Sequence, residues 1–215
     1  MLTSVSDQMP LPVFADTEVS TVLAQIVDDL VTCGWSHQVD FLSSHLASGL
    51  AAECRTRHEH GQLAPAGVGR GAGQAVRDGV RGDHIQWLEA GQSSDCDLYL
   101  RLMDELRLEL NRALFLGLEE YETHFAFYPP GAFYQQHVDR FRDDDRRSIS
   151  IVVYLNQNWR PEHGGALRLH LEGKPPRDIL PLAGSLVVFL SAKMLHEVLP
   201  GTRDRLSLTG WFKCR

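Results

Sequence analysis

The residues with the clearest chemical potential are His137 and Asp139, which end the stretch YPPGAFYQQHVD at 128–139. In an extended strand, side chains two positions apart point to the same face. An imidazole nitrogen and a carboxylate oxygen can therefore reach one metal ion together. A third ligand has to come from elsewhere, and His196, which follows the apolar segment 185–190, is the best candidate. Two histidines and one carboxylate form the facial triad that holds non-haem Fe(II) and leaves positions open.

Three other histidines compete with His196 for the third ligand position. His124 is expected to be a satisfied residue within a strand. His163 lies in a PEHGG turn, where we expect it to be solvated, and His170 lies further along the same half of the chain. His196 is favoured because it lies after the apolar segment 185–190 and precedes Arg205 by nine residues.

Arg205 begins the stretch RLSLTGW, in which Arg205, Ser207 and Thr209 share one face of an expected strand. A guanidinium offers a planar fork of donors that matches a carboxylate. Held near the metal, it would suit the distal end of a dicarboxylic acid. The other interpretation is an ordinary surface arginine at the start of a strand.

Composition limits the classes of protein that fit. The chain has 215 residues and a net charge of −7, so a basic stripe for nucleic acid is not expected. No apolar run approaches a membrane span, and the first ten residues do not resemble a secretory signal. The four cysteines, Cys33, Cys54, Cys96 and Cys214, form no CxxC pair. We therefore expect a reduced, cytoplasmic protein without a membrane or nucleic-acid partner.

The first half of the chain has the periodicity of helices. Residues 1–15 are expected to form a flexible tail, and 16–215 a single domain. Helices are predicted at about 16–33, 44–59 and 94–116, and short strands at 35–41 and 81–88. The segment 61–82 carries seven glycines and is predicted to be a long mobile loop or hairpin.

After Gly117 the pattern changes to that of strands. They are predicted near 121–128, 133–139, 148–155, 166–171, 177–180, 185–190, 195–199 and 205–213. Eight short strands separated by turn residues favour a double-stranded β-helix, the cupin-like jelly roll. The fold class is then α+β with a mainly β core: helical support over 16–117, a jelly roll over 118–213, and the metal between its two sheets.

These motifs together resemble the 2-oxoglutarate- and Fe(II)-dependent dioxygenases, in which a His-x-Asp pair is followed by a distant His and by Arg-x-Ser. The stretch 128–139, VYLNQNW at 153–159, GGALRL at 164–169 and RGDHIQW at 81–87 resemble the prolyl 4-hydroxylase branch. They are similar to the animal oxygen-sensing prolyl hydroxylases and most similar to the bacterial prolyl hydroxylases that modify elongation factor Tu. The resemblance covers about residues 20–213.

The resemblance implies a cosubstrate site beside the metal. Arg205 would anchor 2-oxoglutarate, and the hydroxyls of Tyr128 and Tyr154 would meet its carboxylates. Thr209 offers a further hydroxyl. For Tyr154, which lies in an apolar run, plain core packing is the alternative.

The resemblance also implies a substrate side. Asp83 corresponds to an aspartate that pairs with an arginine matching Arg147, and Trp87 to a tryptophan that flanks the peptide channel. Arg81 belongs to the same RGD motif, for which a surface turn is the alternative. Tyr134 either lines the substrate mouth or packs. The charged run 140–147, directly after Asp139, is a candidate lid.

The implied reaction uses Fe(II), 2-oxoglutarate and O2 to hydroxylate C4 of a prolyl residue in a protein, and it releases succinate and CO2. Ascorbate is a further candidate cofactor, and elongation factor Tu is the candidate partner. One alternative is a hydroxylase of free proline or another small molecule, although the glycine-rich segment 61–82 suits an extended peptide better. Another is a metal-binding jelly-roll module that only binds or senses, against which the complete triad and Arg205 argue.

Overall fold

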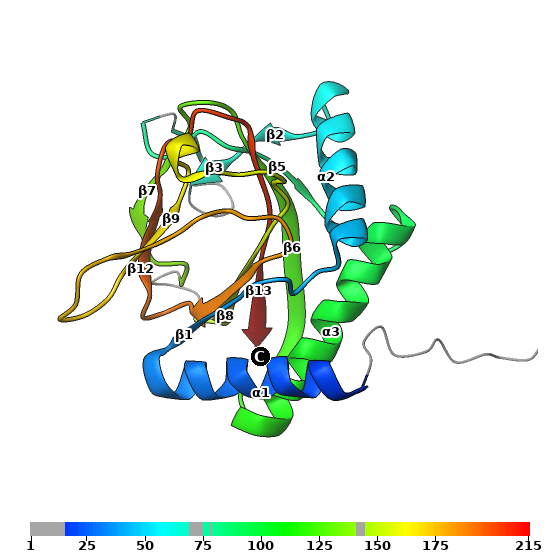
Figure 1. The fold of residues 1–215 in the computed structure, drawn as a ribbon, viewed down its shortest axis with the longest axis vertical. Helices are drawn as coiled ribbons and strands as arrows, with labels where there is room; N and C mark the ends of the chain where they lie inside the picture. Colours follow the sequence, from blue (N-terminus) through cyan, green and yellow to red (C-terminus); the bar gives the residue numbers. More distant parts are fainter. Residues whose placement is uncertain (1–15, 69–74, 78, 141–144) are drawn as a thin grey trace, which may run out of the picture.

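Two antiparallel sheets face each other, and α1, α2 and α3 cover the outer face of the larger one (Figure 1). The computed structural model describes residues 16–68, 75–77, 79–140 and 145–215. The larger sheet has the order β1 (Trp35–Gln38), β11 (Leu186–Leu190), β8 (Arg147–Tyr154), β13 (Arg205–Cys214), β6 (Leu118–Tyr128), β5 (His84–Trp87) and β2 (Ala64–Pro65). The smaller has the order β10 (Arg177–Ile179), β9 (Leu167–His170), β12 (Leu195–Val198) and β7 (Tyr134–His137). This arrangement confirms the predicted jelly-roll core with helical support.

The first two helices have the boundaries that their sequence signals predict. Helix α1 runs Asp16–Cys33 and ends at Gly34, whose φ of +79° favours a residue without a Cβ. Helix α2 runs Ser44–Glu59, and the Ser43 hydroxyl accepts a hydrogen bond from the Leu46 N–H. Within the described ranges, no helix is long and apolar enough to cross a membrane.

Helix α3 (Ser94–Leu114) ends two residues before the predicted boundary. The Asn111 side chain both donates to the Leu118 carbonyl and accepts from its N–H, at 2.8 and 2.7 Å. This clamp draws the chain into β6, and Phe115 takes a left-handed conformation to make the turn. The sequence pattern shows apolar spacing but not this long-range cap.

Alternation along the central strands creates two cores. Phe125, Ile151, Leu208 and their alternate neighbours face the helices, and they join one apolar cluster with residues of α2 and α3. Ala126, Val152 and Phe189 face the smaller sheet and pack with Leu167, Leu169 and Val198. Strands β8 and β11 are therefore buried on both faces, as predicted.

The glycine-rich segment 61–82 contains short pairings at both ends, and its middle lies outside the described residues. Ala64–Pro65 pairs with β5, and β3 (Gly67–Val68) pairs with β4 (Ala75–Val76). Near its end, the Gly82 N–H donates to Phe133 O and the Gln135 N–H donates to Val80 O. These bonds attach the segment to β7, so β5 begins at His84 rather than at the predicted position 81. The middle of the predicted lid, 141–144, also lies outside the described residues.

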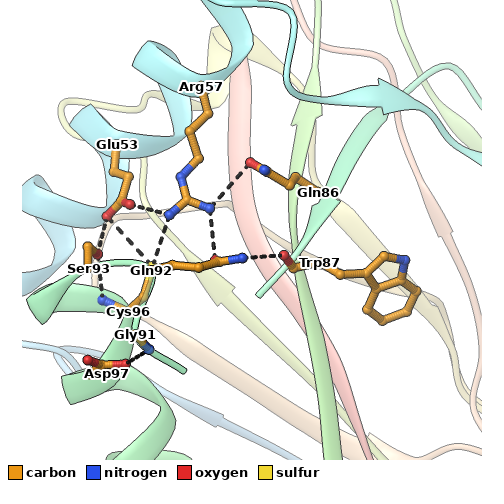
Figure 2. Close-up of polar contacts among 9 residues, drawn as sticks. All are labelled: Glu53, Arg57, Gln86, Trp87, Gly91, Gln92, Ser93, Cys96 and Asp97. Carbon is orange, nitrogen blue, oxygen red and sulfur yellow. Dashed lines mark hydrogen bonds and ion pairs between the residues drawn. The ribbon is translucent and has the colours of Figure 1, made fainter. Parts of the chain in front are cut away.

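A polar cluster fixes β5 to the helices (Figure 2). The buried Arg57 of α2 pairs with Glu53 and donates to Gln86 and Gln92 at 3.3 and 2.9 Å. Gln92 in turn donates to the Trp87 carbonyl at 3.3 Å. Because a buried guanidinium needs partners, these bonds tie α2 to the strand that carries Trp87.

Asn156 connects the end of β8 to the start of β13. Its side chain is buried, donates to Pro181 O and Leu206 O at 2.9 Å each, and accepts from the Leu206 N–H at 2.7 Å. Its side chain therefore holds the backbone of Leu206, the neighbour of Arg205, and ties it to Pro181.

We predict that Asn156→Ala destabilises the protein by about 2–4 kcal/mol, because each buried group left unpaired costs about 1–3 kcal/mol. The measurement is chemical denaturation followed by circular dichroism. Gln157→Ala, the same truncation at an exposed neighbour, should change the free energy of unfolding by less than about 0.5 kcal/mol. Equal effects of the two substitutions would contradict this role for Asn156.

Candidate active site

His137, Asp139 and His196 come together as the sequence predicts. One ligand atom from each residue lies within 4.8 Å of the other two. Within the described residues, these three side chains form a group that could hold a metal ion. His137 Nε2 lies 3.5 Å from Asp139 Oδ1, and His196 Nε2 lies 3.8 Å from Asp139 Oδ2. The two histidines are register partners on β7 and β12, so strand pairing sets their separation.

Each imidazole is oriented by a hydrogen bond from its Nδ1 to a main-chain carbonyl. His137 Nδ1 donates to the Gln135 carbonyl at 2.7 Å, and His196 Nδ1 donates to the Met194 carbonyl at 2.9 Å. A carbonyl oxygen can only accept, so these bonds leave both Nε2 lone pairs directed at a shared metal position. The set of two imidazole nitrogens and one carboxylate fits Fe(II).

Asp139 is held by a chain of two hydroxyls from the larger sheet. Ser191 Oγ lies 2.8 Å from Ser150 Oγ, which donates to Asp139 Oδ2 at 2.7 Å. Burial by itself would raise the pKa of Asp139, but His196, His137 and the Ser150 hydroxyl outweigh it and hold the pKa well below its usual value. The carboxylate is therefore charged and correctly turned for a metal.

Arg205 lies at the inner end of the site and is 3% exposed. Its Nε donates to Gly165 O at 2.9 Å, and its guanidinium lies 5.0 and 5.1 Å from the rings of Tyr128 and Tyr154. Gly165 has a φ of +68°, and a Cβ there would lie 3.0 Å from the Trp159 ring. The glycine pair at 164–165 is thus required for this close approach.

Two buried hydroxyls beside Arg205 have no hydrogen-bond partner in the described part of the chain. They belong to Tyr154 and Ser207, which are cross-strand neighbours on β8 and β13. Burial raises the pKa of Tyr154 to about 12 against the opposing effect of Arg205, so the phenol keeps its proton and can donate. A buried cation with two unpaired hydroxyls fits the distal carboxylate of 2-oxoglutarate.

The inner face of the larger sheet arranges the site in rows of cross-strand partners. Tyr128 pairs with Arg205, and the next row is Ile85, Ala126, Ser207 and Tyr154. The third row is Trp87, His124, Thr209 and Val152, and the fourth contains Glu122, Trp211 and Ser150. Thr209 therefore lies one row further from Arg205 than Ser207 does.

One cavity of about 410 Å³ connects these rows to the metal ligands. Arg205 and Tyr128 line it at the inner end, and the triad lines its side. Trp87, 44% exposed, and Trp211 line its other end. The cavity thus joins a buried anion position to an aromatic end that opens to solvent.

The substrate-side residues lie around this cavity, but two of them pair differently from the prediction. Arg81 Nε and Nη2 donate to Asp83 at 2.7 and 2.6 Å, while Arg147 pairs with Glu122 at 2.8 Å. Among the described contacts, the expected Asp83–Arg147 pair is therefore replaced by two separate ones. Arg81 lies two residues from Asp83 in the segment that leads into β5, so the two side chains can pair locally.

Tyr134 contributes to both sides of the cavity. Its ring stacks on His137 with centroids 3.7 Å apart and lies 4.4 Å from the Arg81 guanidinium. It therefore packs against a metal ligand and also lines the cavity, which combines the two interpretations that the sequence left open.

Sequence reasoning missed several residues of the site. Ser150, Glu122 and Trp211 follow the same alternation as the predicted residues, which is the signal that could have found them. Trp211 carries the guanidinium of Arg147 at 3.5 Å from its ring centroid. His124 was assigned to the interior of a strand, but it also lines the cavity.

We predict that Ser150→Ala weakens Fe(II) binding about tenfold or more, since loss of a residue that orients a metal ligand typically costs 10–100-fold in affinity. Anaerobic calorimetric titration measures the dissociation constant. Ser148→Ala serves as the control, because it removes a hydroxyl from the same strand that, among the described residues, donates to the Arg146 carbonyl and not to a metal ligand. Unchanged affinity in Ser150→Ala would show that Asp139 needs no such support.

Comparisons with known proteins agree with this geometry. Residues 123–213 match the 2OG-Fe(II) oxygenase superfamily. The prolyl hydroxylase EGLN3 of Mus musculus is 32% identical over 200 residues, covering 88% of this chain and 82% of the relative. EGLN3 of Homo sapiens is 32% identical over 204 residues, with the same shares covered.

Two solved structures extend the likeness. A prolyl-4-hydroxylase of Pseudomonas putida is 55% identical, with a TM-score of 0.83 over 90% of this chain and 99% of that chain. A prolyl hydroxylase of Trichoplax adhaerens, in complex with a peptide fragment of the hypoxia inducible factor oxygen degradation domain, is 25% identical, with a TM-score of 0.82 over 94% of each chain. Together with the triad and the anion position, these similarities show that the chain belongs to the prolyl hydroxylases of the 2OG-Fe(II) oxygenase superfamily.

Proposed function

We propose that this chain hydroxylates C4 of a prolyl residue within a protein, with elongation factor Tu as the candidate substrate. The observation that carries the proposal is the single cavity that joins the triad and Arg205 to an open aromatic end. The triad and Arg205 at the inner end of the cavity would suit the metal and the cosubstrate of any member of the superfamily. The outer end is lined by Trp87 and Trp211, of which Trp87 is 44% exposed, and it would receive the target proline from solvent.

The residues divide the work of the reaction. Bound Fe(II) supplies the chemistry by which O2 and 2-oxoglutarate become succinate, CO2 and a hydroxyl group on the substrate carbon. His137, Asp139 and His196 would hold the metal, and Arg205 would hold the far carboxylate of 2-oxoglutarate. The hydroxyls of Tyr128, Tyr154 and Ser207 would surround that carboxylate, and Thr209, one row further from Arg205, would lie closer to the substrate end.

Apolar side chains keep water from the reacting centre. Val152 of the larger sheet and Leu167 and Val198 of the smaller sheet line the cavity beside the triad. An enclosed apolar wall strengthens the polar contacts inside the site and suppresses side reactions. The substrate would complete this enclosure from the open end.

Several observations support a protein substrate in the cytoplasm. The Trichoplax adhaerens relative was solved with a peptide bound, and the sequence resembles bacterial hydroxylases that modify elongation factor Tu. The four cysteines are unpaired, which suits a reducing compartment. The peptide would contact four residues that line the cavity, Arg81, Trp87, Tyr134 and Arg147. Asp83 would act on the substrate side by holding Arg81 in place. Ascorbate would act as an auxiliary reductant.

The direct test incubates the purified protein with Fe(II), 2-oxoglutarate and intact elongation factor Tu. We expect a mass gain of one oxygen atom on a single proline, with a matching amount of succinate. His196→Ala should give neither product, because its Nε2 is one of three metal ligands. Free proline is the parallel arm, and hydroxylation of free proline alone would overturn the assignment of a protein substrate.

We predict that Arg205→Lys raises the apparent KM for 2-oxoglutarate about tenfold or more and changes that for peptide far less. Lysine keeps the charge but loses the planar fork and the bond to Gly165 O. A charge-assisted hydrogen bond contributes about 1.5–3 kcal/mol, and each 1.4 kcal/mol is about tenfold in affinity. Steady-state kinetics with each substrate varied in turn gives both values. A mutant with normal 2-oxoglutarate dependence would remove Arg205 from this role.

A further inference from the structure

His124 is a buried polar residue in the middle of the cavity that the functions above leave unused. It is 2% exposed and lies in the third row of the sheet face, between Trp87 on β5 and Thr209 on β13. This row separates the rows that face the carboxylate of 2-oxoglutarate from the outer row with Trp211. A side chain here would lie closer to the bound substrate than to the carboxylate that Arg205 would hold.

The hydrogen bonds of His124 define its tautomer. Its Nδ1 lies 3.0 Å from the Phe125 carbonyl, which can only accept, so the proton is on Nδ1. Burial lowers the pKa of His124 to about 4, with Asp83 opposing the shift, and the ring is therefore neutral near pH 7. A neutral imidazole has one N–H, so Nε2 presents a bare lone pair.

The described neighbours of the His124 ring include two tryptophan rings. The Trp87 ring meets His124 edge-on with centroids 5.0 Å apart, and the Trp211 ring lies 5.7 Å away. In the described part of the chain, the His124 side chain makes one hydrogen bond, which is the bond to Phe125 O. The residue lines the cavity. An imidazole nitrogen that makes no bond within the described residues, on a side chain that lines a cavity, is available to a ligand that supplies a donor.

We propose that His124 determines specificity by accepting a hydrogen bond through Nε2 from the main-chain N–H of the residue that follows the target proline. The inference rests on the proposed function, because it requires a prolyl peptide in the cavity. It adds that the site recognises a peptide bond, so free proline, which has no following residue, lacks the donor.

The chemistry of the substrate supports this choice of donor. A prolyl residue within a chain has no N–H of its own. The amide N–H of the next residue is the first main-chain donor after the ring. In an aromatic cavity that donor would otherwise lose its hydrogen bond to water on entering. An acceptor one row from the carboxylate position and beside Trp87 and Trp211 compensates for this loss.

A double-mutant cycle between enzyme and peptide tests the contact. One peptide is a prolyl sequence that the enzyme hydroxylates, and its partner has an ester oxygen in place of the N–H after the target proline. Both are titrated into wild-type and His124→Leu protein loaded with Mn(II) and 2-oxoglutarate without O2, so that binding is measured without turnover. A second ester, placed several residues away, is the matched control.

We expect the ester to weaken binding to the wild type about tenfold, equivalent to about 1.4 kcal/mol. His124→Leu should bind the amide peptide about tenfold more weakly and show no further loss with the ester. His124→Gln, which can offer an amide oxygen, should recover part of the difference. Mn(II) affinity and thermal unfolding should be the same in all three proteins, which shows that the site is intact.

The outcomes separate this inference from the proposed function. If wild-type protein hydroxylates prolyl peptides but the two changes weaken binding independently, His124 does not receive that N–H and only the inference fails. If the ester has no effect on the wild type, the inference fails in the same way. If no prolyl peptide or protein is hydroxylated, the proposed function fails, and the inference with it.

Discussion

The structure depends on the two-residue alternation of β13, which pairs with β6 on one side and β8 on the other. The odd-numbered residues Arg205, Thr209 and Trp211 line the cavity, whereas Leu206, Leu208 and Phe212 pack against the helices. A slip of one residue would move the guanidinium into the apolar core and a leucine into the anion position, at a large cost. Burial of the helical layer therefore specifies the register of the site. No additional interaction is needed to align the residues of β13 that face the cavity.

The polar groups that face the cavity are less satisfied than the rest of the protein. Of the five buried side-chain atoms without a partner among the described residues, three belong to Tyr154, Ser207 and Trp211 on this one face. A protein tolerates such a cost where a ligand removes it. Ser150 shows the opposite case, since its hydroxyl is fully used to turn Asp139 toward the metal. The site thus distinguishes groups that hold the protein from groups reserved for ligands.

Local patterns explain which features the sequence could predict. The eight predicted strands of the jelly roll follow from alternation, and the fold class was confirmed. Alternation also explains why the structure places His137, His196 and Arg205 on the faces that the sequence predicted. The partner of Asp83 did not follow, because the choice between two arginines depends on how the segment 79–82 pairs with β7. The end of α3 depends on a bond from Asn111 to Leu118 that has no local signal. His124 was expected to be a satisfied residue within a strand, and only the three-dimensional structure shows that it also lines the cavity.

The two ends of the cavity are held by different kinds of structure. The cosubstrate end lies on β13 and β8, which are central strands with both faces covered, and Arg205 is bonded to the glycine turn at 165. The substrate end includes β5, whose outer neighbour is the two-residue strand β2, so Trp87 depends on the Arg57 cluster for its position (Figure 2). Central strands open last and edges open first. A constant cosubstrate can therefore bind to a rigid end, while the end that meets a protein retains the freedom to adjust to it.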